Sequence, residues 1–336
     1  MNADTKPDPD PDPSDIKRPI PMHRHPVVNR EYRIPTPAID AFYLLIQRAL
    51  RFRSPGASVY GRARFGKSRA IEFLAQMLGT KYANLPVLRL ACQRKKTPSE
   101  LAFFANLLTA ASHKATTGGT TTAVRQRLNN RLREIAERSN ANRIVLFADD
   151  AQRLFEIEYE WLQEVHDELR KNSVSLVTFL VGTPLLRGQK SLFQSQGLDQ
   201  LVARFMVDDL PFRGLLGAQD CATCMHSYDV TIEPAKSTWT YTQFFLPKAF
   251  DAGLRLGNFG AAVWDAFVDA HHEARLPGDV EIPMEYFTRT IEFVLTEYVD
   301  ADTPTFKPDA RMWTEAVRYS GFHKALELTS PGLAEP

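Results

Sequence analysis

Short runs of apolar residues alternate along the chain with longer stretches that carry apolar residues at helical spacing. The apolar runs lie at residues 57–60, 86–92, 144–148, 174–181 and, more weakly, 205–210. The helical stretches occupy residues 38–51, 67–78, 98–111, 124–139 and 154–171. Short buried strands that alternate with helices predict an α/β fold, a parallel sheet with helices on both faces.

After Pro211 the pattern changes to helices without further convincing strands, which predicts a small all-helical domain. At the other end, the run P-D-P-D-P-D-P has no apolar residue to bury and predicts an extended arm. We therefore expect four segments. They are an arm at residues 1–30, an α/β domain at 31–212, a helical domain at 213–300, and a C-terminal segment at 301–336 that either packs on the body or docks a partner. The helical domain is expected to contain helices at residues 242–256, 259–272 and 283–298, and the C-terminal segment one at 311–328.

Composition narrows the class of protein. Of the 336 residues, 44% are hydrophobic and 24% are charged, which is ordinary for a globular chain and excludes a mostly disordered one. Three cysteines cannot form a disulfide scaffold, so we expect a reducing, cytoplasmic location. The longest uncharged apolar stretch has 14 residues and contains Ser, Thr, Gly and Pro, so no membrane span is expected.

The net charge of +1 conceals an asymmetry. Residues 33–143 hold 20 Lys and Arg against 5 Asp and Glu, whereas residues 144–336 hold 16 against 29. Such a division suits a polyanion partner such as nucleic acid, and also head-to-tail association of identical copies. Alternatively, the two surfaces simply neutralise each other within one fold.

The clearest motif is G-R-A-R-F-G-K-S, which lies between a predicted strand and a predicted helix and matches G-x-x-x-x-G-K-[ST]. Glycines allow the backbone to wrap a polyphosphate, and the N–H groups of the helix N-terminus face its oxygens. We expect Lys67 to bridge the β- and γ-phosphates of ATP and Ser68 to ligate Mg²⁺. The candidate nucleotide-binding residues are Gly61, Arg62, Ala63, Arg64, Phe65, Gly66, Lys67, Ser68 and Arg69.

Two acids end the predicted strand in R-I-V-L-F-A-D-D-A-Q. Asp149 is placed to hold the Mg²⁺ shell and Asp150 to polarise the attacking water, although Asp is one methylene shorter than the Glu that ATPases commonly use there. Thr183 follows the next strand and is a candidate to contact the γ-phosphate or the water. The alternatives are two acids that cap the following helix and an ordinary turn after a strand.

These residues, in this order, resemble an AAA+ ATPase, and more narrowly the transposition regulators of the TniB/TnsC type. The narrower likeness rests on I-P-T-P-A-I-D before the loop, F-A-D-D-A-Q, F-L-V-G-T-P-L-L, L-V-A-R-F followed by D-L-P-F, and G-N-F-G. It extends over residues 31–275. The resemblance implies an AAA+ sheet domain followed by a helical lid.

The resemblance also implies a role. Such ATPases bind ATP between neighbouring copies, polymerise on double-stranded DNA, and link a target-selection adaptor to the transposase. By position, Arg204 matches the arginine that reaches the adjacent copy's γ-phosphate; otherwise it is a surface residue that pairs with Asp208 or Asp209. Asn258 stands where many lids place a sensing Arg, and the Asp–Asp pair also departs from the pattern. Both departures suit a slow ATPase.

Loops after the second strand of that family face duplex DNA. The corresponding residues here are Arg94, Lys95 and Lys96, with Lys114, Thr116 and Arg125 after them. Cations on loops bind phosphates without reading sequence, and the chain carries no motif that reads bases. The alternative for Arg94–Lys96 is a solvated run of charge. Two other functions stay open at this point: a protein-directed AAA+ ATPase, and a nucleotide-gated signalling or scaffold module.

Overall fold

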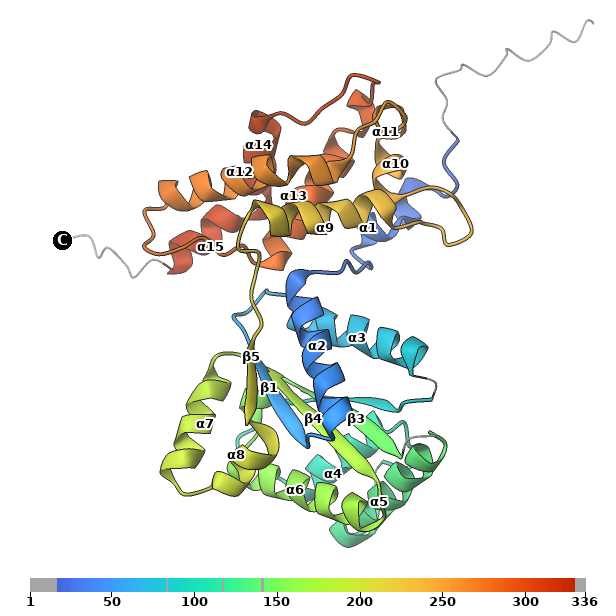
Figure 1. Ribbon diagram of the computed structural model, residues 1–336, viewed down its shortest axis with the longest axis vertical. Coiled ribbons are helices and arrows are strands. Elements are labelled where there is room, and N and C mark those ends of the chain that lie inside the picture. Colours follow the sequence, from blue (N-terminus) through green and yellow to red (C-terminus); the bar gives the residue numbers. More distant parts are fainter. Residues whose placement is uncertain (1–16, 83, 117, 140–141, 330–336) are drawn as a thin grey trace, which may run out of the picture. The chain divides into compact units, whose positions relative to one another are not determined.

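The computed structural model describes residues 17–82, 84–116, 118–139 and 142–329, and these divide into two units. The first, called the α/β unit here, consists of Pro35–Leu215 together with Pro283–Glu285. The second, the helical unit, consists of the described residues up to Ile34, then Leu216–Ile282, and then those from Tyr286 onward. Figure 1 labels the elements of both units.

A five-stranded sheet forms the centre of the α/β unit. Its strands lie in the order β2-β3-β4-β1-β5, and every neighbouring pair is parallel. Because parallel strands end at the same edge, the residues that follow β1, β2, β3 and β4 come together there. The predicted α/β fold is confirmed. The strands are β1 (Gly56–Tyr60), β2 (Val87–Ala91), β3 (Arg143–Asp149), β4 (Ser175–Gly182) and β5 (Asp208–Pro211).

Helices cover both faces of the sheet, as the alternation of runs predicted (Figure 1). Val145 and Phe147 of β3 belong to the core cluster that contains α2 (Pro37–Phe52) and α3 (Lys67–Lys81). Their neighbours Leu146 and Ala148 belong to the opposite cluster, because successive side chains of a strand point to opposite faces. The second cluster is built by α4 (Glu100–Ala110), α5 (Thr121–Glu137), α6 (Glu156–Lys171), α7 (Leu185–Ser195) and α8 (Asp199–Phe205), and the short helix η2 (Ala151–Arg153) follows β3.

The weak apolar run at 205–210 was predicted to be a strand throughout, and its first residue is instead helical. Phe205 ends α8, and β5 begins only at Asp208. The reason is the spacing of Leu201 and Phe205, which buries both on one face of a helical turn. Arg204 therefore lies on a helix rather than at a strand end.

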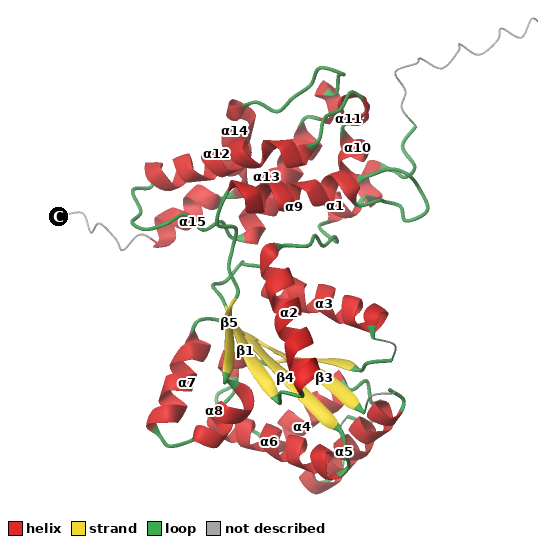
Figure 2. Cartoon of the chain, viewed as in Figure 1, coloured by secondary structure: helices red, strands yellow, loops and turns green. Residues whose placement is uncertain are grey.

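The described part of the helical unit consists of helices and loops, with an isolated antiparallel bridge between Ile232 and Thr240 (Figure 2). The predicted helix at 242–256 is interrupted at Pro247, and that at 311–328 at Gly321, whose φ is +86°. The helices are η1 (Met22–Arg24), α1 (Pro26–Asn29), α9 (Ala218–Val230), α10 (Tyr241–Phe245), α11 (Pro247–Asp251), η3 (Leu256–Phe259), α12 (Gly260–Glu273), α13 (Met284–Glu297), η4 (Val299–Ala301), α14 (Ala310–Ser320) and α15 (Phe322–Thr329).

An extended arm was expected over residues 1–30, but residues 17–30 belong to the helical unit. His25 and Val27 are buried, and the His25 ring stacks on Phe244 with 4.3 Å between centroids. Burial lowers the pKa of His25 to about 4. The Pro/Asp run itself, within residues 1–16, lies outside the described residues.

The segment expected as a separate C-terminal piece, residues 301–336, joins the helical unit as far as the structure describes it. Trp313 of α14 is fully buried, and its ring lies 6.1 Å from that of Phe259. Residues 330–336 lie outside the described residues. None of the helices in the described part of the chain is long and apolar enough to span a bilayer.

Candidate nucleotide-binding site

The loop between β1 and α3 has the backbone that its two fixed glycines require. A Cβ at Gly61 would lie 2.2 Å from the carbonyl oxygen of Phe212, so no larger residue fits. Gly66 has a φ of +90°, in the left-handed region, and it begins α3 without any side-chain cap. The first N–H groups of α3 therefore face the loop with no side chain of Gly66 competing for them. The backbone at these two glycines has the form that an anion-binding loop requires.

Lys67 folds back into this loop. Its Nζ donates to the carbonyl oxygens of Gly61, at 2.8 Å, and Arg62, at 2.7 Å. Burial lowers the pKa of Lys67, and the negative charges of Asp150 and Asp149 oppose that shift. The ammonium group is thus held inside the loop by weak carbonyl acceptors, which the oxygens of a polyphosphate are equipped to replace.

The remaining loop residues have distinct surroundings. Phe65 is buried in the core beneath the loop, whereas Arg62, Ala63 and Arg64 are exposed. The carbonyl oxygen of Arg64 accepts from the N–H of Glu285 at 3.2 Å, and the Arg64 guanidinium lies 3.6 Å from the Glu285 carboxylate. The short segment Pro283–Glu285 therefore rests on the phosphate loop as part of the α/β unit. This contact was not predicted, because its two sides are more than 200 residues apart in sequence.

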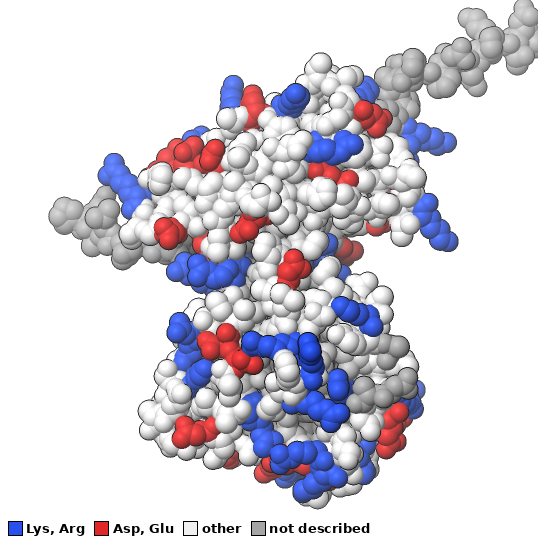
Figure 3. Space-filling model, viewed as in Figure 1, with Lys and Arg blue, Asp and Glu red and all other residues white. Residues whose placement is uncertain are grey.

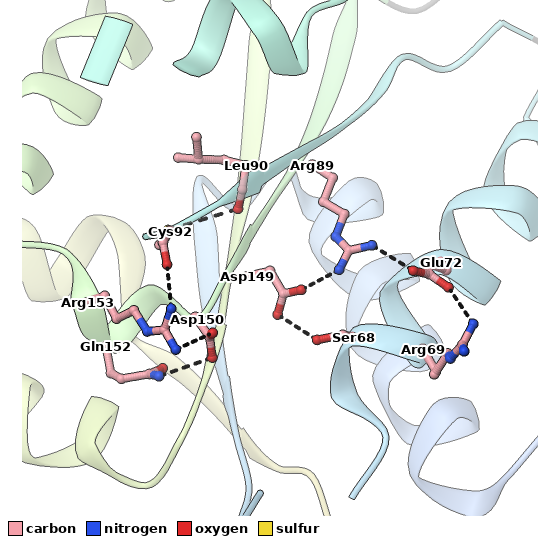
Figure 4. A network of polar contacts seen from close by, with 10 residues as sticks. All are labelled: Ser68, Arg69, Glu72, Arg89, Leu90, Cys92, Asp149, Asp150, Gln152 and Arg153. Atoms are coloured by element: carbon pink, nitrogen blue, oxygen red, sulfur yellow. Dashed lines mark hydrogen bonds and ion pairs between the residues drawn. The ribbon is translucent and has the colours of Figure 1, made fainter. Parts of the chain in front are cut away.

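The hydroxyl of Ser68 and the carboxylate of Asp149 meet across the sheet edge (Figure 4). Ser68 Oγ donates to Asp149 Oδ1 at 3.2 Å, and Asp149 is buried. A hydroxyl and a carboxylate oxygen side by side are hard ligands of the kind that Mg²⁺ prefers. The two residues expected at the metal therefore fit one. Arg89 of β2 binds the other carboxylate oxygen, Oδ2, at 2.6 Å, and sequence reasoning missed it.

Asp150 and Thr183 are joined through Gln152, a residue that sequence reasoning used only as part of the D-A-Q phrase. Gln152 Nε2 donates to Asp150 Oδ1 at 3.2 Å, and Gln152 Oε1 accepts from the N–H of Thr183 at 3.0 Å. Arg153 lies 3.1 Å from the other oxygen of Asp150. The Thr183 hydroxyl is buried and has no hydrogen-bond partner among the described residues, so its capacity to form a hydrogen bond is unused.

Arg204 lies at the opposite edge of the sheet from the phosphate loop. It lines a cavity of about 700 Å³ together with Arg53, Arg170 and the residues that begin β4. Its guanidinium pairs with Asp167 at 2.8 Å, and not with Asp208 or Asp209, which pair with Arg48 and Lys190. The structure therefore separates Arg204 from the loop of its own chain, as a contact to a neighbouring copy requires.

Asn258 belongs to the helical unit and is not among the residues of the α/β unit that form the site. It lines a cavity of about 530 Å³ with His226 and Arg255. The glycines of G-N-F-G are explained by packing, because a Cβ at Gly260 would lie 2.5 Å from the Cβ of Ala222. The structure thus gives this phrase a packing role.

The candidate DNA-binding cations divide into two groups. Lys95 pairs with the buried carboxylate of Glu158 at 2.6 Å, and Arg125 pairs with Glu100 and Glu164. Arg94, Lys96 and Lys114 are exposed, with no ion pair to another described residue, and Thr116 is half-buried. Figure 3 shows Lys and Arg side chains gathered on the face of the α/β unit that it displays. The loop after β2 begins at the same sheet edge as the phosphate loop.

A family model matches the part of the chain that contains these site residues. Residues 53–189 match the model of the AAA domain, a range that runs from before β1 to α7 and includes the phosphate loop, Asp149, Asp150 and Thr183. The matched range covers less than half of the chain. No curated protein matches the chain in sequence.

One solved structure extends the likeness in fold beyond residues 53–189. The ORC2 protein of Aeropyrum pernix, in ADPNP–ADP complexes, aligns with a TM-score of 0.53 and 12% identity over 88% of this chain and 71% of that chain. The ORC1 protein of the same organism, in complex with DNA, aligns with a TM-score of 0.49 and 11% identity over 86% of this chain and 67% of that chain. At such identities the likeness concerns the fold alone.

Proposed function

We propose that this chain is a cytoplasmic AAA+ ATPase that binds ATP and Mg²⁺, assembles head-to-tail on double-stranded DNA, and hydrolyses ATP slowly to end the assembly. The proposal rests on the arrangement of side chains at one edge of the sheet. There the Lys67 ammonium, the Ser68–Asp149 pair and the Asp150–Gln152–Thr183 chain lie at the ends of three neighbouring strands.

Each residue of this edge has a defined task in the proposal. The loop N–H groups and Lys67 bind the phosphates, while Ser68 and Asp149 hold the metal, which neutralises charge on the β- and γ-phosphates when bound. Asp150 accepts the proton of the attacking water, and Gln152 fixes the direction of its carboxylate. The buried Thr183 hydroxyl orients the water or the γ-phosphate. Arg62, Ala63, Arg64 and Arg69 contribute the outer wall of the nucleotide site.

The position of Arg204 supports self-association. An arginine that faces away from its own phosphate loop acts on a nucleotide only if another copy presents one. Repetition of this contact joins the Arg204 edge of one copy to the phosphate-loop edge of the next, which is a heterologous interface and generates a ring or a filament. The excess of positive charge in residues 33–143 supports DNA as the scaffold for that assembly.

We infer further that the chain regulates transposition, linking a target-selection adaptor to transposase subunits. This finer role rests on the sequence phrases F-L-V-G-T-P-L-L and L-V-A-R-F and on the absence of a motif that reads bases. A factor that binds duplex DNA through Arg94, Lys96 and Lys114 without reading sequence suits a system in which another component chooses the site.

The pairing of Asp150 with Arg153 favours one alternative, a nucleotide-gated scaffold or signalling module that binds ATP and barely turns it over. That module would oligomerise with ATP whether or not DNA is present. A protein-directed ATPase would turn over ATP at a rate that DNA does not change.

The experiment measures ATP turnover and assembly mass, the latter by light scattering, with and without a random-sequence duplex. The proposal predicts ATP-dependent assembly that the duplex strengthens, and no assembly for Lys67→Ala, because the phosphates lose their cationic partner. Normal ATP-dependent assembly by Lys67→Ala would refute the proposed mechanism.

A further inference from the structure

Arg89 places a positive charge directly behind the candidate metal site. It is the central residue of β2, and its two outer nitrogens bind two different carboxylates. Nη2 lies 2.6 Å from Asp149 Oδ2, and Nη1 lies 2.9 Å from Glu72 Oε1 of α3. The Glu72 carboxylate in turn lies 3.5 Å from the guanidinium of Arg69, which follows Ser68 in the first turn of α3 (Figure 4).

The strand pattern explains why this side chain reaches the site. Leu88 and Leu90 are buried on one face of β2, so Arg89 between them points to the opposite face, toward α3. Asp149 is paired in register with Ala91 on the neighbouring strand, which brings its carboxylate within reach of the guanidinium. The pair is thus fixed by two secondary-structure elements rather than by flexible loops.

The geometry leaves the two oxygens of Asp149 with separate tasks. Oδ2 is occupied by Arg89, and Oδ1 accepts from the hydroxyl of Ser68 at 3.2 Å. A carboxylate fixed at one oxygen by a planar guanidinium cannot rotate freely about its last bond, so its other oxygen keeps its direction. The hydrogen bonds to Asp149 and Glu72 hold the guanidinium between two carboxylates.

We propose that Arg89 is the positioning residue of the Mg²⁺ site, holding Oδ2 of Asp149 so that Oδ1 is presented to the metal beside Ser68. This inference rests on the proposed function, since it requires that Mg²⁺ arrives with a nucleotide. Glu72 completes the arrangement: it balances the charge of Arg89, so that the guanidinium orients Asp149 without adding an unpaired positive charge near the metal.

The test is a titration of MgCl₂ into the full-length protein with the fluorescent nucleotide mant-ATP, which reports binding and not turnover. Arg89→Gln and Arg89→Met both remove the guanidinium, and the methionine keeps the apolar stem. In both variants the Mg²⁺ concentration at half-saturation should rise about ten-fold, while mant-ATP affinity in EDTA stays at the wild-type value. Arg89→Lys keeps the charge but cannot bridge two carboxylates. Its Mg²⁺ concentration at half-saturation should therefore lie between that of the wild type and those of the Gln and Met variants.

The matched control is Arg48→Gln. It breaks the ion pair of another arginine of the α/β unit, Arg48 with Asp208, which shares no residue with the Arg89 contacts. It should leave the Mg²⁺ half-saturation unchanged. An unchanged half-saturation in both Arg89 variants would overturn the inference, and so would a lower one, which would mean that Arg89 repels the metal. Failure of the wild-type protein to bind mant-ATP at all would instead refute the proposed function.

Discussion

Asp150, the residue that we propose as the general base, forms an ion pair with Arg153, with 3.1 Å between Oδ2 and Nη2. The other oxygen of Asp150 is bound by Gln152. A base acts only if one of its oxygens is within hydrogen-bonding distance of the proton that it takes. Because both oxygens are engaged, we propose that these contacts of Asp150, rather than its short side chain, keep hydrolysis slow.

Arg153→Gln should therefore speed hydrolysis. Both members of the pair are about two-fifths exposed, so the pair is weak, and its removal should raise ATP turnover by about two- to five-fold. Turnover is measured as phosphate release at saturating ATP without DNA. The companion variant Asp150→Asn should lower turnover by about a hundred-fold while mant-ATP affinity is kept. A drop in turnover for Arg153→Gln would show that Arg153 assists the reaction rather than restraining Asp150.

Mixing two inactive variants tests whether Arg204 acts on a neighbouring copy. Arg204→Ala removes the arginine but leaves its own phosphate loop intact, and Lys67→Ala does the reverse. In a head-to-tail assembly, a site formed by the loop of the first variant and the arginine of the second has both groups. We expect turnover by the mixture to exceed the sum of the separate variants, measured by phosphate release. Turnover equal to that sum would place Arg204 outside the active site of a neighbour.

Removal of the cations after β2 should affect DNA binding for two of them and protein stability for the third. Arg94→Ala and Lys96→Ala should each weaken duplex binding and reduce the slope of log K against log salt by about one, because each removes one phosphate contact. Lys95→Ala should leave that slope unchanged and instead lower the free energy of unfolding by about 2 kcal/mol, since it leaves the buried Glu158 carboxylate without its partner. Equal effects of the three variants on the slope would contradict this division.

His166 should make the α/β unit sensitive to acid. Burial lowers its pKa to about 3, from 6.5 in the unfolded chain, and its Nε2 shares a hydrogen bond with Thr178 Oγ1. Below pH 6.5 the unfolded chain therefore binds a proton at His166 that the folded protein does not bind. The contribution of neutral His166 to the free energy of unfolding is complete above pH 6.5 and is lost as the pH falls toward 3.

His166→Gln keeps a hydrogen-bonding side chain but does not titrate. Over about 1.5 pH units below 6.5, the wild type should lose about 2 kcal/mol more unfolding free energy than the variant. Urea unfolding at the two pH values measures the difference. His25 is present in both proteins and contributes equally to both, so parallel losses would mean that His166 has no such role.

Sequence patterns predicted the sheet well because its signals are local. Each strand is a short run of apolar residues, and the phosphate loop is eight consecutive residues, so the positions of Lys67, Ser68 and Asp149 followed directly. The end of α8 was misread because Phe205 is apolar in either a helix or a strand, and only its packing with Leu201 decides between them.

The groups that sequence reasoning missed contact residues that are far away in the sequence. Arg89 looked like an ordinary charge between two leucines, and its role appears only when β2 and β3 are paired in register. Gln152 contacts Thr183 from 31 residues away, and Glu285 contacts Arg64 across most of the chain. Even Lys95, in a run of three cations, differed from its neighbours only through a carboxylate on a separate helix.

Anisotropy of a fluorescent random-sequence duplex, titrated with the protein in ATP, in ADP and without nucleotide, tests the central claim most directly. Each titration is done at about 50 and 200 mM salt, a range over which several phosphate contacts change affinity steeply. The account predicts tight binding with ATP, weaker binding in the other two conditions, and a steep loss of affinity at the higher salt. Absence of binding in every condition would contradict it and leave an ATPase or scaffold that acts without DNA.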